Sequence, residues 1–143
     1  MHTRLFSAAC DYKRIGDGDE GPNTGGMGAY AVPPFATPEL LEDVMTTIIE
    51  PTARAMAAAD SPMIGVFFAG LMLTANGPRV IEFNCRFGDP ETQVMLPLLD
   101  GDLVDLLYRT PTGALGDMDT IPMRTVAAGG VVLAARGYPR AYA

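Results

Sequence analysis

Carboxylate, amide and guanidinium side chains alternate at the end of one apolar segment, residues 79–91, RVIEFNCRFGDPE. Glu82 and Asn84 are separated by one residue, so on a β-strand both side chains point to the same face. A carboxylate and an amide oxygen on one face suit Mg²⁺, which prefers oxygen ligands and often shares them with phosphates. The alternative is a solvent-facing strand edge on which Val80 is also exposed.

Arg86 follows at the same spacing. If the strand continues that far, Arg86 joins the face of the two metal-ligand candidates, where its planar guanidinium could bind a carboxylate or a phosphate. An ion pair with Asp89 or Glu91 is the competing interpretation. These two acids flank Pro90, a pattern that also favours the first turn of a helix.

A second group of candidates lies in the glycine-rich segment 11–30, DYKRIGDGDEGPNTGGMGAY. Its weak apolar periodicity predicts a long loop, and such loops are usually functional or disordered. Residues 23–27 are neutral and could present backbone N–H groups to an anion. The adjacent basic pair near them is a candidate phosphate contact. In both cases the alternative is a solvated surface loop. The residues are Asn23, Thr24, Gly25, Gly26 and Met27, with Lys13 and Arg14 as the basic pair.

The elements that position these residues follow from local signals. The apolar run 64–74 predicts a strand buried on both faces. The Asn76-Gly77 pair predicts a hairpin turn that leads into a partner strand at 80–84. Thr37 and Pro38 predict a helix start, and Pro51 is expected to kink or end that helix.

The remaining segments predict shorter elements. We expect helices at 92–99 and 102–108, a linker over 110–122 and a further strand at 126–134.

Composition limits the function classes. The chain has 143 residues and a formal net charge of −7, and no basic patch is available for a nucleic-acid partner. The two cysteines form no CxxC pair and the single histidine is His2, which argues against a disulfide framework, a zinc site and Ser–His–Asp catalysis. With no apolar run of membrane-spanning length, we expect a cytoplasmic protein that has no membrane partner.

The motifs together resemble the glycinamide ribonucleotide synthetase family of the ATP-grasp superfamily. The matching blocks occur in the family's order and cover nearly everything from Asp11 onward. They are DYKRIGDGDEGPNTGGMGAY, FAGLMLT, IEFNCRFGDPETQ, GDLVDLL and VVLAARGYP, and RFGDPE is the most specific of them.

The resemblance implies an α+β fold. It implies a partial ATP-grasp domain, mainly antiparallel sheet with packed helices, plus the first strand of a C-terminal domain. Residues 1–109 would form the ATP-grasp part, 110–124 a linker and 125–143 the start of the last domain. The family's reaction joins glycine to 5-phosphoribosylamine in de novo purine biosynthesis, with ATP consumed and glycyl phosphate as the intermediate.

The resemblance also implies roles for the candidate residues. Glu82 and Asn84 would hold Mg²⁺ or Mn²⁺ against the ATP phosphates. Arg86 would be catalytic and bind the carboxylate or acyl phosphate as charge develops. The basic pair would contact ATP. The pockets for glycine and phosphoribosylamine would be shaped by Asn23, Thr24, Gly25, Gly26, Met27, Asp89 and Glu91, while ATP itself would be held partly by Lys13 and Arg14.

Two departures from the family pattern bear on activity. Many ATP-grasp enzymes carry a second acidic ligand on the facing hairpin strand, but counting across the turn places Gly70 there. The family's chain also extends beyond both ends of this one, so we expect a segment that needs the missing parts of the same enzyme and is inactive alone. The alternative is a truncated, inactive remnant that at most binds Mg²⁺ and anions.

Overall fold

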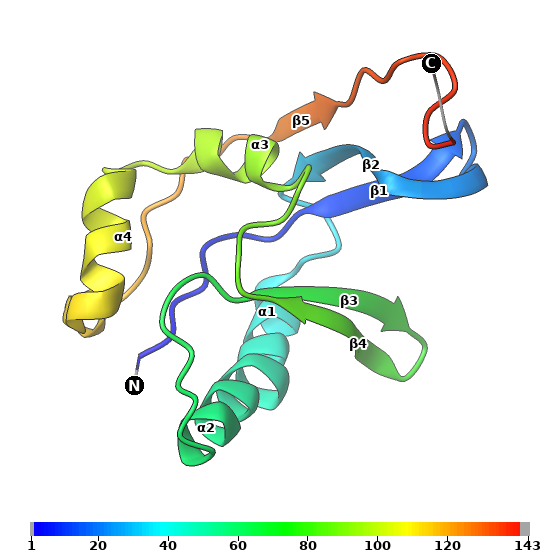
Figure 1. Cartoon of the computed structure of the whole chain (residues 1–143). Coiled ribbons are helices and arrows are strands. Elements are labelled where there is room, and N and C mark those ends of the chain that lie inside the picture. Colours follow the sequence, from blue (N-terminus) through cyan, green and yellow to red (C-terminus); the bar gives the residue numbers. More distant parts are fainter. Residues whose placement is uncertain (1, 141–143) are drawn as a thin grey trace. The chain divides into compact units, whose positions relative to one another are not determined.

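The computed structural model describes residues 2–140 (Figure 1). The chain divides into two compact units. The first comprises Pro34–Phe87, Leu99–Met123 and the residues up to Phe6. The second comprises Ser7–Pro33, Gly88–Leu98 and the residues from Arg124 onward.

Both units combine helices with antiparallel strands, so the α+β prediction is confirmed. The predicted domain boundaries stay a prediction. The last three residues of the range 125–143 lie outside the described residues.

In the first unit, α1 (Pro38–Val44) begins where the sequence predicts. The side-chain oxygen of Thr37 accepts a hydrogen bond from the backbone N–H of Leu40 at 3.3 Å. Pro38 occupies the start of the helix, where its missing N–H costs nothing because no partner would be available there. The predicted N-cap is therefore confirmed.

The helical path does not end at Pro51 (Figure 1). A π-helical segment, η1 (Met45–Ile49), follows α1 and leads into α2 (Glu50–Ala58), with Pro51 in its first turn. Proline cannot donate to a carbonyl one turn back, and wider turns of this kind accommodate such a break in the ladder. The chain thus stays helical across the proline through a change of helix type.

The hairpin of β3 (Phe68–Thr74) and β4 (Gly77–Asn84) also belongs to the first unit. Gly77 has φ +86° and the predicted turn is confirmed. The prediction of a strand over 64–74 buried on both faces is wrong. Gly65, at φ +136°, interrupts the extended backbone before Phe68. Met72 keeps 55% of its surface exposed on this two-stranded sheet, and an apolar run alone cannot reveal how many strands cover it.

The last helix of the first unit, α4 (Leu103–Thr112), is longer than predicted. Asp102 caps it, because its Oδ1 accepts hydrogen bonds from the N–H groups of Val104 at 2.7 Å and Asp105 at 3.2 Å. Gly113, at φ +80°, ends the helix, and a 3₁₀ turn at Ala114–Asp117 follows. Part of the predicted linker over 110–122 is therefore regular structure.

The second unit contains a three-stranded antiparallel sheet in the order β1-β2-β5. Its strands are β1 (Cys10–Gly16), β2 (Glu20–Ala31) and β5 (Ala128–Val131). The prediction of a long loop over 11–30 is wrong, because that segment is the β1–β2 hairpin. Gly18 and Asp19, at φ +71° and +60°, make its turn. The strand predicted at 126–134 is shorter than expected.

A short helix packs on this sheet. α3 (Thr92–Met95) continues into the 3₁₀ segment η2 (Leu96–Leu98), close to the helix predicted at 92–99. Val94 and Leu98 are each only 1% exposed. Gly130 in β5 lets α3 approach, since a Cβ there would lie 3.2 Å from Val94 Cγ1. Within residues 2–140 we find no helix of the length and apolar character that a membrane crossing needs.

The cap at Asp102 gives a stability test. We expect Asp102→Ala to lower the free energy of unfolding by about 1 kcal/mol, because two N–H groups of the first turn lose their acceptor. Urea denaturation followed by circular dichroism measures the change. Asp102→Asn is the matched control and should retain most of the stability, since asparagine caps nearly as well. An equal loss in both variants would contradict the capping role.

Candidate functional site

Glu82 and Asn84 share one face of the β3–β4 hairpin. In the ladder, Glu82 pairs with Gly70 and Asn84 pairs with Phe68. Opposed residues of an antiparallel pair point to the same face and next-but-one residues do likewise. The predicted common face is therefore confirmed, as is the expectation that Gly70 lies across from Glu82.

The missing side chain at Gly70 leaves space for the stem of Glu82. A Cβ on Gly70 would be 3.2 Å from Cγ of Glu82, so the glutamate stem lies across β3 at this bare position. Glu82 is exposed and makes no hydrogen bond or ion pair within the described part of the first unit. The carboxylate is thus available to bind a ligand.

The opposite face of the hairpin is apolar. Phe83 pairs with Ala69 and stacks on Phe67, with ring centroids 4.8 Å apart and planes at 22°. On β4, Phe83 therefore points to one face, and Glu82 and Asn84 point to the other. This arrangement aims the candidate metal ligands away from the aromatic contact.

Arg86 does not continue this strand. β4 ends at Asn84 and Arg86 lies in a bend, where its Nη1 donates to the carbonyl of Phe87 at 2.8 Å. The prediction that strand alternation carries Arg86 onto the face of Glu82 is wrong, because the strand has already ended. The competing ion pair with Asp89 or Glu91 stays a prediction, since both acids belong to the second unit.

The second unit brings the glycine-rich strand and the Asp-Pro-Glu motif together. Gly26 has φ +138°, and a Cβ there would lie 2.3 Å from Cδ of Pro90. Only glycine fits both this backbone conformation and this contact. Sequence segments more than sixty positions apart therefore meet at Gly26 and Pro90.

The two acids beside Pro90 have different surroundings. Asp89 is exposed and accepts a hydrogen bond from Gln93 Nε2 at 2.9 Å. Glu91 is only 5% exposed, and its Oε2 has no hydrogen-bond partner among the described residues. The predicted helix start at Pro90 is wrong by two residues, because α3 begins at Thr92 with Glu91 before it.

The candidate anion-binding N–H groups already have acceptors. The N–H of Gly25 donates to Tyr138 Oη at 3.0 Å, and that of Gly26 to Thr24 Oγ1 at 3.0 Å. The Thr24 hydroxyl in turn donates to the carbonyl of Lys13 at 2.8 Å. The expectation that these two N–H groups are open to an anion is therefore wrong for this conformation, while Asn23 and Met27 remain on β2 beside them.

The basic pair is held by local contacts. Nζ of Lys13 lies 2.5 Å from a carboxylate oxygen of Asp11. Nη1 of Arg14 donates to the carbonyl of Gly21 at 2.6 Å, across the β1–β2 hairpin. Both side chains are exposed, and their predicted contact with ATP stays a prediction.

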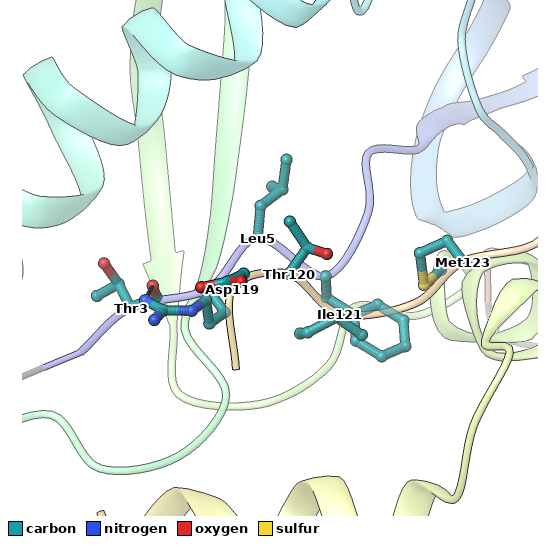
Figure 2. A pocket seen from close by; sticks show the side chains of 8 residues that line it. Thr3, Leu5, Asp119, Thr120, Ile121 and Met123 are labelled. Carbon is teal, nitrogen blue, oxygen red and sulfur yellow. Dashed lines mark hydrogen bonds between the residues drawn. The ribbon is translucent and has the colours of Figure 1, made fainter. Parts of the chain in front are cut away.

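One pocket of the first unit contains none of the predicted residues. It has a volume of about 390 Å³ and lies between the N-terminal segment and residues 119–123 (Figure 2). Arg4 fixes that segment by donating to the carbonyls of Met118 and Gly116. No sequence signal marks this pocket, because its walls come from two segments without regular structure. Its lining comprises Thr3, Arg4, Leu5, Phe6, Asp119, Thr120, Ile121 and Met123.

Comparisons with known proteins identify the class of fold. The structure superposes on the phosphoribosylamine–glycine ligase of Thermotoga maritima with a TM-score of 0.81 and 36% identity, covering 95% of this chain and 34% of that one. Residues 1–92 match the model described as phosphoribosylglycinamide synthetase, ATP-grasp (A) domain. The fold is thus part of an ATP-grasp domain. The chain belongs to the phosphoribosylglycinamide synthetase family.

Relatives of known name agree with this assignment. The phosphoribosylamine–glycine ligase of Rhizobium meliloti (strain 1021) is 56% identical over 137 residues, which are 96% of this chain and 32% of that ligase. The bifunctional purine biosynthetic protein ADE1 of Schizosaccharomyces pombe is 50% identical over 139 residues, 97% of this chain and 18% of that protein. The chain spans about a third of the length of the single-function relatives.

The contact between Gly26 and Pro90 gives a second stability test. We expect Gly26→Ala to lower the free energy of unfolding by about 2–4 kcal/mol, because the methyl group meets the proline ring and the backbone conformation is strained for alanine. Urea denaturation measures the loss.

The matched control is Gly129→Ala, where a Cβ has no neighbour within 4 Å and the backbone is not left-handed. It should change stability by less than about 0.5 kcal/mol. Similar losses of unfolding free energy in the two variants would show that the approach of Pro90 does not exclude a side chain at position 26.

Proposed function

We propose that the chain is a cytoplasmic segment of an ATP-dependent ligase that joins glycine to 5-phosphoribosylamine. The observation that carries the proposal is the shared face of Glu82 and Asn84, with bare backbone opposite at Gly70. The family assignment supplies the reaction, in which ATP converts the glycine carboxylate to an acyl phosphate and the amine of phosphoribosylamine displaces phosphate.

The donor set on this face fits Mg²⁺ or Mn²⁺. Within residues 2–140 no group of three or more histidine, cysteine, aspartate or glutamate side chains could hold a metal ion. On the face of β4, Glu82 offers a carboxylate and Asn84 an amide oxygen. Mg²⁺ is commonly bound through one or two carboxylates together with substrate phosphates and water, so two protein ligands are sufficient when a nucleotide is present.

The metal ion would supply charge neutralisation on the ATP phosphates. Glu82 and Asn84 would orient that complex from β4, because both are fixed by pairing with β3. Arg86 would bind the carboxylate of glycine or the acyl phosphate from the bend after the strand. Its hydrogen bond to the carbonyl of Phe87 uses only one of its donors, which leaves the rest of the guanidinium for a ligand.

The second unit would supply substrate contacts. The buried carboxylate of Glu91 has an oxygen without a partner, and such a group is stabilised by a cationic or hydrogen-bonding ligand. Asp89 and the strand residues 23–27 lie in the same unit. We assign these residues to the pockets for glycine and phosphoribosylamine, and the basic pair Lys13 and Arg14 to ATP.

The isolated chain is expected to be inactive, because it covers about a third of its relatives. A chimera tests the function directly. The chain replaces the matched segment of the Rhizobium meliloti ligase, and glycine-dependent ADP formation is measured with phosphoribosylamine generated in situ. We expect the chimera to turn over and the isolated chain not to. An inactive but folded chimera would favour the alternative, a truncated remnant.

The metal assignment has its own test in that chimera. We expect Glu82→Ala and Asn84→Ala each to lower kcat/KM at least about a hundredfold, since a lost ligand weakens stabilisation of the phosphate charge. Raising the Mg²⁺ concentration should partly restore the rate. Glu42→Ala, which removes an exposed carboxylate on α1, is the control and should leave activity unchanged. Equal activity of the Glu82 variant and this control would refute the assignment.

A further inference from the structure

An irregularity in the hairpin ladder changes which residues share the face of Glu82. Leu71 pairs with Val80, whereas Gly70 pairs with Glu82, so Ile81 has no partner and forms a β-bulge. Gly70 and Leu71 are adjacent and point to opposite faces. Val80 therefore points to the face opposite to Glu82, although the two residues would share a face on a regular strand.

The same irregularity moves Arg79. Arg79 pairs with Met72, which lies two positions from Gly70 and so shares its face. Arg79 therefore lies on the face of Glu82 and Asn84. Strict alternation would have put it on the other side, because Arg79 precedes Glu82 by an odd number of residues.

The surroundings leave the Arg79 guanidinium open to a ligand. Arg79 is exposed and makes no hydrogen bond or ion pair within the described part of the first unit. Neighbouring positions on one strand face lie about 7 Å apart, which a guanidinium on its flexible stem can span. Gly70, which lies across from Glu82 on this face, carries no side chain.

The Arg79 guanidinium lies on the same face as the Glu82 carboxylate, and its positive charge limits which ligands can bind at this face. A guanidinium and a divalent cation repel each other unless an anion lies between them. Phosphate oxygens satisfy both, because guanidinium binds phosphate through paired charge-assisted hydrogen bonds and the metal takes another oxygen. We propose that Arg79 is a third binding residue of this face and contacts a phosphate of the metal–nucleotide complex. The inference rests on the proposed function.

Binding measurements on the 143-residue chain test this without turnover. The affinity for Mn²⁺ alone is measured by electron paramagnetic resonance, and the affinity for ATP at saturating Mn²⁺ by isothermal titration calorimetry. We expect Arg79→Gln to weaken ATP binding about tenfold and to leave Mn²⁺ affinity unchanged or higher, because a neighbouring positive charge is removed. Arg79→Lys should recover part of the ATP affinity through its charge.

Loss of ATP affinity without loss of Mn²⁺ affinity separates a binding role of Arg79 from structural damage to the hairpin. A misfolded hairpin would lower the affinity for Mn²⁺ as well as for ATP. Loss of both in Arg79→Gln, or unchanged ATP affinity, would overturn the proposal.

A position-swapped variant is the matched control. The double variant R79V/V80R keeps composition and net charge but moves the guanidinium to the apolar face. It should lose ATP affinity to the same extent as Arg79→Gln. Wild-type ATP affinity in the swapped variant would show that charge alone matters and would overturn the proposal. If circular dichroism shows that the swapped variant is unfolded, the ATP affinities of Arg79→Gln and Arg79→Lys decide whether Arg79 binds the phosphate.

Glu82→Ala distinguishes failure of this inference from failure of the proposed function. If the wild-type chain binds no ATP with Mn²⁺, or if Glu82→Ala binds both ligands like the wild type, the metal–nucleotide face itself is refuted. If Glu82→Ala weakens binding while Arg79→Gln matches the wild type, the face stands and only the role of Arg79 is refuted.

Discussion

The pairing of Glu82 with Gly70 is the contact on which the candidate metal face depends. A Cβ at position 70 would lie 3.2 Å from Cγ of Glu82, so the glutamate stem would have to shift by a few tenths of an ångström to keep its place across β3. The same pairing excludes a second carboxylate from the facing strand, since glycine offers no ligand. One backbone position thus leaves room for the glutamate stem and limits the number of protein ligands, and any bound cation must complete its coordination with phosphate and water.

Glycine has a different role in the second unit. At Gly26 the missing Cβ allows the ring of Pro90 to approach the strand, and the left-handed backbone excludes other residues. The Asp-Pro-Glu motif is thereby held against β2, and Glu91, the last residue of the motif, is buried. Both candidate clusters therefore depend on close packing against bare backbone, although they belong to different units.

Local signals in the sequence predicted local structure well. The Thr37 cap, the turn at Asn76-Gly77 and the shared face of Glu82 and Asn84 each depend on a few neighbouring residues. The β1–β2 hairpin could not be predicted in this way. Its strands are rich in glycine, and their extended form comes from pairing with each other and with β5 rather than from apolar alternation.

The site residues show the same limit. Side chains alternate between the two faces only within a strand. Because β4 ends at Asn84, this alternation does not place Arg86 on the predicted face. Alternation also assumes an unbroken ladder, and the bulge at Ile81 places Arg79 on the face of Glu82 and Val80 on the opposite face. The burial of Glu91 and the contact at Gly26 join segments distant in sequence, which a single sequence does not reveal.

The bulge has a further consequence for how this hairpin tolerates changes in length. Ile81 is the residue of β4 that has no partner across the ladder, and 63% of its surface is exposed. Losing it would join Val80 directly to Glu82 while every existing pair, from Thr74 with Gly77 to Phe68 with Asn84, kept its partner. A deletion at this point would therefore preserve the faces of the strand, whereas a deletion inside the regular part of β4 would shift the residues beyond it by one register.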